Sequence, residues 1–304
     1  MGFRTAVIEL AAVKVSVRQR ATDYLALVKP RVVVMVLVVT AAGFYMGATG
    51  TTDWVSLLHL LLGVALAAGG ALALNQYGER DVDALMRRTQ SRPLPDGRIP
   101  PLAALCFGVV ITLAGLLYTA VMAHPLAGVV TAVTAGSYLF LYTPLKLKTS
   151  FCSMVGAIPG ALPPVTGWVV ARGELSAEAG VLFAILFLWQ LPHSLAIAWL
   201  YREDYARAGF QLLPVKHPDG HSTGCHIVVT SLVLLGVGLL PALCGLAGPV
   251  YFVTAGMLGL ALLGFGIDTA WSRTAEAARR LVLASLVYLP VLFLLMVLDK
   301  VPKP

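Results

Sequence analysis

WVSLLHLLLGVALAAGGALALNQY, residues 54–77, is the stretch that decides the fold. A helix needs about 20 predominantly apolar residues to cross the hydrocarbon core of a bilayer, and this stretch is long enough and carries no Asp, Glu, Lys or Arg. Over the whole chain of 304 residues, 58% are hydrophobic and only 12% are charged, which is too few charges to coat a soluble globule of this size. The sequence therefore predicts a protein whose surroundings are mostly lipid.

Similar apolar stretches recur along the chain and predict an all-α, polytopic membrane protein with nine transmembrane helices in one bundle. Residues 32–39 are rich in β-branched side chains, but an unpaired strand cannot satisfy its backbone in hydrocarbon, so a helix is expected there as well. We expect residues 1–27 to form a cytoplasmic N-terminal tail and residues 28–304 to form one domain. The expected spans are residues 32–50, 54–77, 101–122, 125–143, 152–170, 179–200, 226–247, 250–270 and 281–299.

The Lys and Arg residues indicate the orientation, because basic residues near the ends of spanning segments are retained on the cytoplasmic side. With a cytoplasmic N-terminus, only Arg172, Lys300 and Lys303 of the 22 basic residues fall outside. An odd number of helices then places the C-terminus outside. The net charge of +7 is thus concentrated on one face, where it favours anionic lipid or an anionic substrate and does not indicate nucleic-acid binding.

The chemistry is expected where the second helix ends, in the run NQYGERDVDALMRRTQSRPLPDGRIP at residues 75–100. Asn75, Glu79 and Asp83 are spaced four apart, so on a continuing helix each lies only about 40° round from the last and all three share one face. Mg²⁺ prefers such hard oxygen ligands and bridges them to substrate phosphates. The spacing therefore favours a metal site at the cytoplasmic mouth of the bundle.

Arginines follow the carboxylates within the same run. Arg87 is expected in register with the three oxygen ligands one helical turn further along, and Arg88 and Arg92 come close behind it. Forked, permanently charged guanidinium groups suit diphosphate oxygens, so the run has the composition of a Mg²⁺-diphosphate site. The alternative to such a site is a solvated helix end whose acidic and basic side chains form ion pairs, which would show the same mixed charge.

The run NQYGERDVDALMRRTQSRPLP, residues 75–95, resembles the first signature of the intramembrane UbiA-type prenyltransferase superfamily. Glu at the middle acidic position is the variant typical of the heme O synthase family. Further regions of that family are similar to this chain in the same order, and together they cover most of it from residue 75 onward. They are YTPLKLKTSFCSMVGAIPGALPPVTGW at 142–168, LPHSLAIAWLYREDYARAGFQLLPV at 191–215 and YLPVLFLLMVLD at 288–299.

The resemblance implies a reaction, a cofactor and partners. The enzyme would use Mg²⁺ to transfer the farnesyl group of farnesyl diphosphate to a vinyl group of heme b (protoheme IX), giving heme O for heme-copper terminal oxidases. It would sit among lipids in a bacterial plasma (inner) membrane. A heme A synthase or oxidase assembly factors would act downstream of it.

The resemblance also assigns roles to residues. Asn75, Glu79 and Asp83 would hold Mg²⁺, and the diphosphate would be bound by Arg87, Arg88, Arg92 and Lys146. In the second acidic region the superfamily often shows two aspartates four apart, whereas Ala208 follows Asp204 at that spacing here. We therefore expect Asp204 as a catalytic metal ligand, with Glu203 as a further candidate, and a second metal ion is less secure than the first.

His193 is the first candidate for contact with heme, since an imidazole can bind the iron. It follows Pro192 inside an apolar helix, where a polar side chain needs a reason to be present. A hydrogen-bonded core histidine is the alternative. Tyr201 and Tyr205 flank the acids of the second region and are further candidates for ligand contact, or else interfacial tyrosines.

Two other functions fit parts of the pattern. A prenyltransferase of the same superfamily with a quinone precursor or another aromatic acceptor would share the acidic motif, although the Glu79 variant favours heme. A cation transporter would spread its acids through the depth of the bilayer, whereas Asn75, Glu79 and Asp83 crowd at one face.

Overall fold

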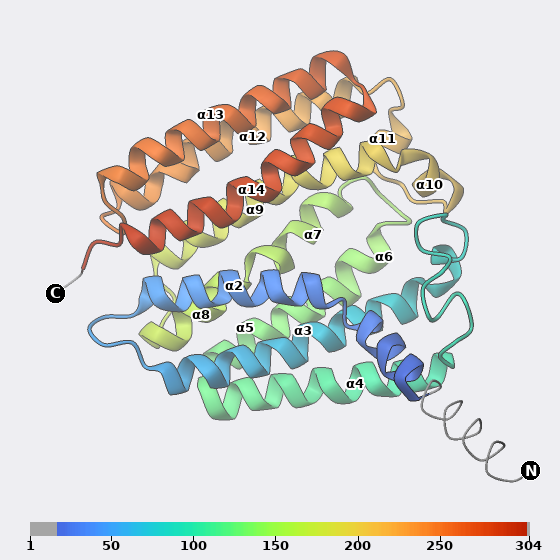
Figure 1. Cartoon of the computed structure of the whole chain (residues 1–304), viewed down its shortest axis with the longest axis horizontal. Coiled ribbons are helices and arrows are strands. Elements are labelled where there is room, and N and C mark those ends of the chain that lie inside the picture. Colours follow the sequence, from blue (N-terminus) through green and yellow to red (C-terminus); the bar gives the residue numbers. More distant parts are fainter. Residues whose placement is uncertain (1–16, 303–304) are drawn as a thin grey trace, which may run out of the picture.

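The computed structural model describes residues 17–302, and within them nine helical segments are long and apolar enough to cross a membrane. The predicted all-α membrane bundle is therefore confirmed, and the segments lie side by side (Figure 1). They are α2 (Pro30–Gly47), α3 (Trp54–Asp83), α4 with η1 (Pro101–Tyr118, Thr119–Ala123), α5 with η2 and α6 (Pro125–Gly136, Ser137–Tyr142, Thr143–Leu145), α7 with α8 (Cys152–Ala161, Pro163–Arg172), α9 (Ala177–Leu200), α12 (His221–Leu243), α13 (Pro249–Ser272) and α14 (Ala275–Leu298).

Several helices extend beyond the apolar stretches that predicted them. Helix α3 continues to Asp83, α12 begins at His221 and α14 begins at Ala275. Hydropathy marks only the part of a helix that lies in hydrocarbon, whereas backbone hydrogen bonding and caps set its ends. At the start of α14, for example, the Thr274 hydroxyl accepts a hydrogen bond from the Ala277 amide.

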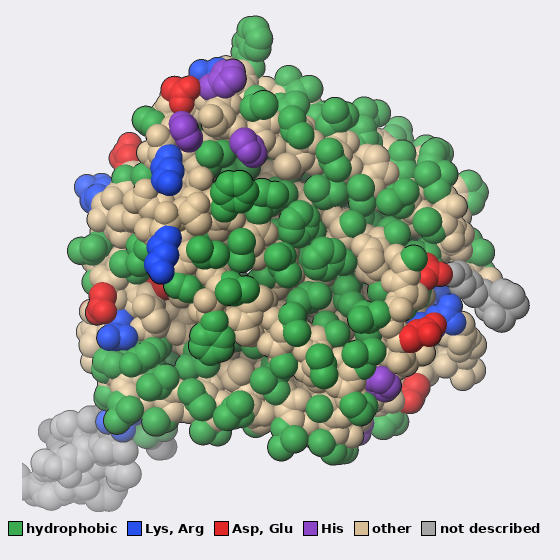
Figure 2. Space-filling view, turned by 180° about the vertical axis from the view of Figure 1, so that it is seen from behind, with side chains coloured by type: hydrophobic (Ala, Val, Ile, Leu, Met, Phe, Trp, Pro, Cys, Tyr) green, Lys and Arg blue, Asp and Glu red, His purple; other side chains and the backbone are tan. Residues whose placement is uncertain are grey.

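The surface agrees with a membrane location. Hydrophobic side chains cover the middle of the face in Figure 2, and charged side chains gather toward its two ends. Large apolar residues such as Val129, Leu232 and Val253 are exposed because lipid, not water, is their solvent. The chain is therefore an integral membrane protein.

Part of the predicted N-terminal tail packs against the bundle. Residues 17–27 are helical, and Leu27 is buried. The Asp23 carboxylate pairs with Arg98 at 3.1 Å, and the Gln76 amide donates to the carbonyls of Ala26 and Leu27. Residues 1–16 lie outside the described part of the chain, so the domain boundary after residue 27 stays a prediction.

Glycines allow α2 and α8 to cross closely. A Cβ added at Gly43 would clash with the carbonyl oxygen of Pro164, and one at Gly167 would clash with the carbonyl oxygen of Thr40. Backbone cannot move aside as a flexible side chain does. Small residues at this crossing therefore fix the distance between the two helices.

Gly167→Ala is expected to destabilise the bundle by about 1–3 kcal/mol, because the new methyl group forces α2 and α8 apart. The matched control is Gly180→Ala in α9, where nothing lies within 4 Å of the added Cβ. Thermal unfolding of both variants in the same detergent measures the difference. Equal midpoints for the two variants would contradict the close crossing.

Candidate active site

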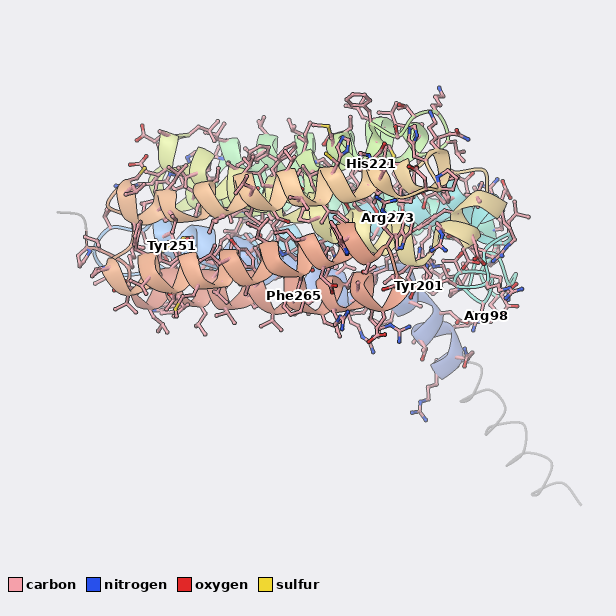
Figure 3. All side chains as sticks on the ribbon, turned by 90° about the horizontal axis from the view of Figure 1, so that it is seen from above. Arg98, Tyr201, His221, Tyr251, Phe265 and Arg273 are labelled. Atoms are coloured by element: carbon pink, nitrogen blue, oxygen red, sulfur yellow. The ribbon has the colours of Figure 1, made fainter. Side chains whose placement is uncertain are left out.

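The loops that follow α3 and α9 meet at one end of the bundle. We call this end, formed by residues 75–100 and 201–220, the inner rim. The Arg88 guanidinium of the first loop donates to the Tyr205 hydroxyl of the second at 3.0 Å. Figure 3 shows Arg98 and Tyr201 toward this end of the bundle and Tyr251 near the opposite end.

Asn75, Glu79 and Asp83 lie buried in the last three turns of α3, with exposures of 1%, 8% and 1%. Asp81, which lies between the two acids in sequence, is exposed. The Asn75 amide nitrogen donates to the Thr143 hydroxyl at 3.1 Å, which leaves its amide oxygen free to accept. The structure thus presents one amide oxygen and two carboxylates from a single helix face.

Each of these three oxygens faces a cation. Lys29 Nζ lies 3.5 Å from Asn75 Oδ1, and Lys146 Nζ lies 2.6 Å from Glu79 Oε1. Arg92 Nη1 lies 2.6 Å from Asp83 Oδ2. The cations come from the start of α2, the end of α6 and the loop after α3, so three segments converge on the oxygens of α3.

Lys29 was missed as a site residue, because its sequence signal was that of an ordinary basic residue before the first span. Its φ of 48° is a left-handed conformation that non-glycine residues adopt uncommonly, and α2 begins directly after it at Pro30. The Gln76 amide holds the preceding carbonyls of Ala26 and Leu27. The connection between the first helix and α2 is thereby fixed, and it directs the Lys29 ammonium toward Asn75.

The environment of Lys29 makes its charge easy to lose. Burial and the positive charges of Arg92 and Lys146 lower the pKa of Lys29 from the usual 10.5 to about 7. The carboxylates of Glu79 and Asp83 oppose this shift but do not outweigh it. A bound anion next to this ammonium would raise the pKa of Lys29 again.

Binding of a diphosphate is therefore expected to weaken as pH rises above about 7, by up to about tenfold per pH unit, because the neutral form of Lys29 must then take up a proton on binding. Lys29→Arg keeps the charge at every pH and should flatten the dependence, since an arginine is always protonated. Titration with farnesyl diphosphate from about pH 6 to about pH 9 measures the affinity of the wild type and of Lys29→Arg. The same slope in wild type and Lys29→Arg would assign the pH dependence to another group.

Arg87 is not in register with the three oxygens, and that expectation was wrong. Helix α3 ends at Asp83, and the chain then turns. The Thr89 hydroxyl donates to the Asp83 carbonyl at 2.8 Å, and the Met86 side chain is buried, so the next residues cannot continue the helix. Arg87 is consequently exposed, while Arg92 returns to pair with Asp83.

Arg88 connects the first loop to the second acidic region. Besides its hydrogen bond to Tyr205, its guanidinium lies over the rings of Tyr201 and Tyr205, at 4.9 and 5.5 Å from their centroids. The backbone N–H of Gln211 donates to the Lys146 carbonyl at 2.8 Å and ties the same region to the end of α6. The second region therefore borders the site on two sides.

The acids of that region lie on the short helix α10 (Arg202–Arg207). Asp204 is half-buried and pairs with Arg207, and Glu203 is exposed. Within residues 17–302 no group of three His, Cys, Asp or Glu side chains is gathered closely enough to hold a metal ion. Metal binding by Asp204 and by Glu203 stays a prediction.

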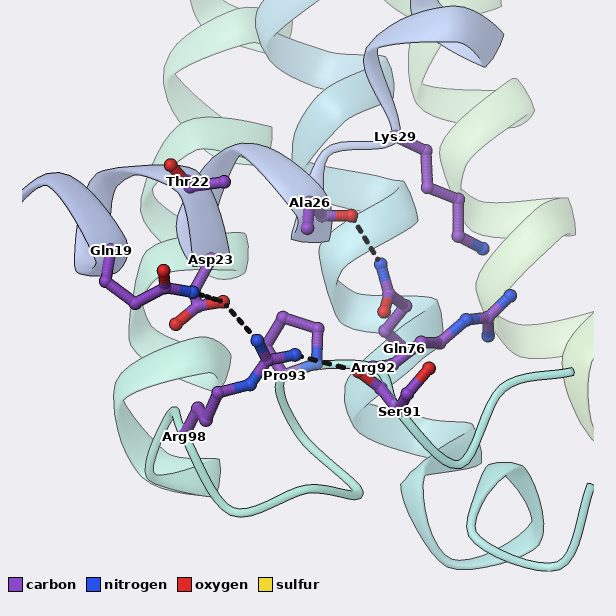
Figure 4. Close-up of a pocket in the computed structure, with 10 residues that line it drawn as sticks. All are labelled: Gln19, Thr22, Asp23, Ala26, Lys29, Gln76, Ser91, Arg92, Pro93 and Arg98. Atoms are coloured by element: carbon purple, nitrogen blue, oxygen red, sulfur yellow. Dashed lines mark hydrogen bonds and ion pairs between the residues drawn. The ribbon is translucent and has the colours of Figure 1, made fainter. Parts of the chain in front are cut away.

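A pocket of about 350 Å³ adjoins the site (Figure 4). Lys29, Gln76 and Arg92 line it together with the N-terminal helix, and the ion pair between Asp23 and Arg98 crosses its wall. Of the three cations of the site, Lys29 and Arg92 are therefore accessible from this pocket.

The oxygens of α3 fit a Mg²⁺ ion in their chemistry. Asn75, Glu79 and Asp83 supply the hard donors that this ion prefers, and the carboxylates of Glu79 and Asp83 already compensate positive charges. Lys146 also lies over the Tyr142 ring, 4.4 Å from its centroid, so aromatic faces border the charged cluster. Oxygen ligands beside cations and aromatic rings suit an anionic substrate with an apolar tail.

His193 lies deeper, within the membrane-spanning part of α9. Its Nδ1 is 2.7 Å from the Ser285 hydroxyl, and its ring stacks on Trp189 with centroids 4.9 Å apart. These contacts agree with a hydrogen-bonded core histidine. Contact with heme stays a prediction.

The chain thus combines an all-α membrane bundle with a cluster of oxygen atoms and cations at one rim. The chain belongs to the UbiA prenyltransferase family, which it matches over residues 36–295. Its relatives include protoheme IX farnesyltransferases. That of Solibacter usitatus (strain Ellin6076) is 46% identical over 287 residues, which cover 91% of this chain and 98% of the relative. The resemblance recognised in the sequence is confirmed.

Solved structures share the fold. A digeranylgeranylglyceryl phosphate synthase has a TM-score of 0.78 at 14% identity, with 92% of this chain and 98% of that chain covered. A UbiA homologue from Archaeoglobus fulgidus bound to GPP and Mg²⁺ has a TM-score of 0.63 at 16% identity, with 90% and 99% covered. At these identities the likeness concerns the fold.

Proposed function

We propose that this protein transfers the farnesyl group of farnesyl diphosphate to a vinyl group of heme b, giving heme O and releasing diphosphate. The observation that carries the proposal is the cluster at the inner rim, where the buried oxygens of Asn75, Glu79 and Asp83 each face a cation. The choice of heme as the acceptor rests on the relatives that are protoheme IX farnesyltransferases. The cluster itself suits a diphosphate and does not distinguish between acceptors.

The residues of the cluster have two different roles. Asn75, Glu79 and Asp83 would hold Mg²⁺, which when bound neutralises charge on the leaving diphosphate. Lys146 and Arg92, released from their carboxylates, then bind diphosphate oxygens. In this exchange the net charge around the cluster changes little, since the cations remain paired with anionic oxygens throughout.

The transfer breaks the bond between carbon 1 of the farnesyl chain and a diphosphate oxygen, whose electrons leave with the diphosphate. A heme vinyl carbon forms the new bond to carbon 1, and the resulting cation takes up water and loses a proton to leave a hydroxyl group. The protein must exclude water until that bond has formed. An apolar cluster beside the site serves this purpose, and Tyr142 and Tyr205 pack against it. It consists of Met86, Cys152, Ala198, Ala208, Phe210 and Leu212.

The sequence and the relatives support a proposal for the location and orientation of the protein. We place the protein in a bacterial plasma membrane, with the inner rim and the N-terminus in the cytoplasm and the C-terminus outside. The basic residues of the loops support this orientation. A heme A synthase or an oxidase assembly factor is the proposed recipient of the product.

One assay tests the function. Purified protein in lipid is supplied with Mg²⁺, heme b and farnesyl diphosphate, and mass spectrometry should detect a heme heavier by a farnesyl group and water. A quinone precursor replaces heme b in a parallel reaction. Prenylation of that aromatic acceptor, with heme b left unchanged, would assign the protein to another branch of the family.

A further inference from the structure

The pocket between the N-terminal helix and the loop after α3 (Figure 4) contains a buried acceptor that nothing in the described chain satisfies. Gln76 lines this pocket and is 1% exposed. Its Nε2 donates both hydrogens, one to the Ala26 carbonyl at 3.1 Å and one to the Leu27 carbonyl at 2.9 Å, so the orientation of the amide is fixed. Among residues 17–302, Gln76 Oε1 has no hydrogen-bond partner. Because an unpaired buried acceptor is costly, the pocket suits a ligand that can donate a hydrogen.

The charged side chains of the pocket are mostly positive. Lys29, Arg92 and Arg98 all line it. Asp23 is the one acid in the lining among residues 17–302, and it is already paired with Arg98 at 3.1 Å. The lining therefore carries a net positive charge, and the ligand that it suits is an anion.

The size and polarity of the pocket exclude a prenyl chain. Its volume of about 350 Å³ lies near the lower end of the range for small-molecule sites. Ala26 and Pro93 are the only apolar residues among the described residues that line it. The lining extends from the exposed Thr22 and Ser91 to the buried Gln76. A small hydrophilic anion fits such a pocket, whereas a farnesyl tail would lose its apolar surroundings.

Arg98 is held in place with donors to spare. Its Nη1 pairs with Asp23, its Nε lies 3.0 Å from an Asp96 carboxylate oxygen, and its Nη2 donates to the Ser91 carbonyl at 2.8 Å. A guanidinium group has five N–H donors, and these three contacts leave one hydrogen on Nη1 and one on Nη2. Two hydrogens on neighbouring nitrogens suit two oxygens of one phosphoryl group.

The pocket shares two cations with the candidate active site. Lys29 Nζ lies 3.5 Å from Asn75 Oδ1, and Arg92 Nη1 lies 2.6 Å from Asp83 Oδ2, yet both side chains also line the pocket. Figure 4 shows their charged ends pointing to the same side. An anion that leaves the oxygen ligands of α3 can therefore keep contact with these cations while it enters the pocket.

The leaving group of the proposed reaction has the chemistry that the pocket requires. When the bond to carbon 1 breaks, the diphosphate oxygen keeps both bonding electrons and becomes an additional ionisable group of the free ion. It takes up a proton from water near neutral pH, so the free ion carries an O–H at an oxygen that the ester lacks. Free diphosphate has also lost the apolar tail that holds the substrate in the membrane.

We infer that this pocket is a binding site for the released diphosphate, in which Gln76 Oε1 accepts the O–H and Arg98 binds phosphoryl oxygens. The inference rests on the proposed function only for the identity of the leaving ion, since every acceptor of the prenyl group leaves the same diphosphate. Lys29 and Arg92 are shared by the substrate and the product, whereas Gln76 and Arg98 contact the product alone.

Calorimetric titration of the purified protein in phosphatidylcholine tests this difference between product and substrate. Inorganic diphosphate is titrated without Mg²⁺, because the α3 carboxylates then repel an anion and the pocket is the site measured. Arg98→Met should weaken this binding about tenfold or more and leave the affinity for farnesyl diphosphate with Mg²⁺ unchanged. Arg80→Met removes a cation that pairs with Asp81 outside the pocket and should change neither affinity. Wild-type affinity for inorganic diphosphate in Arg98→Met, or an equal loss for both ligands, would overturn the assignment. Wild type that fails to bind farnesyl diphosphate with Mg²⁺ would count against the proposed function instead.

Thr22→Glu tests the pocket without removing any of its cations. Thr22 is exposed, so the substitution adds an acid to the wall and should weaken binding of inorganic diphosphate about tenfold. Thr22→Gln has the same size without the charge and should bind almost as wild type does. Equal affinities in the two variants would contradict an anion in this pocket.

Two further ligands test the O–H and the source of the anion. Methyl diphosphate has an ester oxygen in place of the additional ionisable one and should bind wild type about tenfold more weakly than inorganic diphosphate. Equal affinity would overturn the role of Gln76. Soluble dihexanoyl phosphatidate should displace inorganic diphosphate no better than inorganic phosphate does. Stronger displacement by the phosphatidate would assign the pocket to a lipid headgroup and overturn the proposal.

Discussion

Asp83→Asn is expected to lower kcat for farnesyl transfer by about 10²–10³-fold, the usual cost of losing one electrostatic contact to a developing charge. The substitution keeps the shape of the side chain but removes the carboxylate that faces Arg92 at the end of α3. A bound metal ion would then lose a charged ligand, and Arg92 loses its anionic partner. Single-turnover kinetics with heme b and farnesyl diphosphate measure the effect.

Asp81→Asn is the matched control for this experiment. Asp81 lies two residues away on the same helix, but its side chain is 84% exposed, and among residues 17–302 it pairs only with Arg80 at 3.6 Å. An exposed pair of this kind contributes little, so the variant should turn over at close to the wild-type rate. Equal losses in both variants would mean that the charge of the helix end matters and not the face that Asp83 occupies.

Lys146→Met is expected to have the second large effect, a loss of about 2–5 kcal/mol in binding of farnesyl diphosphate. Lys146 is mostly buried against Glu79 and Tyr142. In the proposed complex it leaves Glu79 to bind a diphosphate oxygen, so its removal would take a cation from the diphosphate. Isothermal titration with farnesyl diphosphate in the presence of Mg²⁺ measures the affinity.

Lys148→Met tests whether the loss of affinity in Lys146→Met comes from the position of Lys146 or only from its charge. Lys148 is two residues further along the same loop, and its side chain is exposed. Any long-range attraction of the basic loop for an anion would fall similarly in both variants. We expect Lys148→Met to bind almost as wild type does. Comparable losses of affinity in both variants would mean that Lys146 acts only through the long-range electrostatic field of the basic residues.

Local patterns were enough to predict the scaffold. Hydropathy gave the nine spans, and the spacing of Asn75, Glu79 and Asp83 gave one buried face, because helical periodicity operates over a few residues. The end of α3 was harder to predict. It depends on burial of Met86 and on the hydrogen bond from Thr89, and both are tertiary features, so Arg87 was placed wrongly.

Contacts between distant segments explain the remaining differences between the sequence-based predictions and the structure. Lys29 is 46 residues from Asn75, and Arg88 is 117 residues from Tyr205. No periodicity relates positions so far apart, and a basic residue at the inner face has an ordinary meaning as a topology signal.

In the proposed complex, the oxygen ligands of α3 hold a metal ion that also contacts the substrate diphosphate. Mn²⁺ replaces Mg²⁺ in such sites and is visible by electron paramagnetic resonance, and farnesyl thiodiphosphate is a poorly reactive analogue of the substrate. With both bound, wild type should show phosphorus coupling to the Mn²⁺ ion, and the double variant Glu79→Gln, Asp83→Asn should lose the bound ion. Undiminished phosphorus coupling in the double variant would contradict the account.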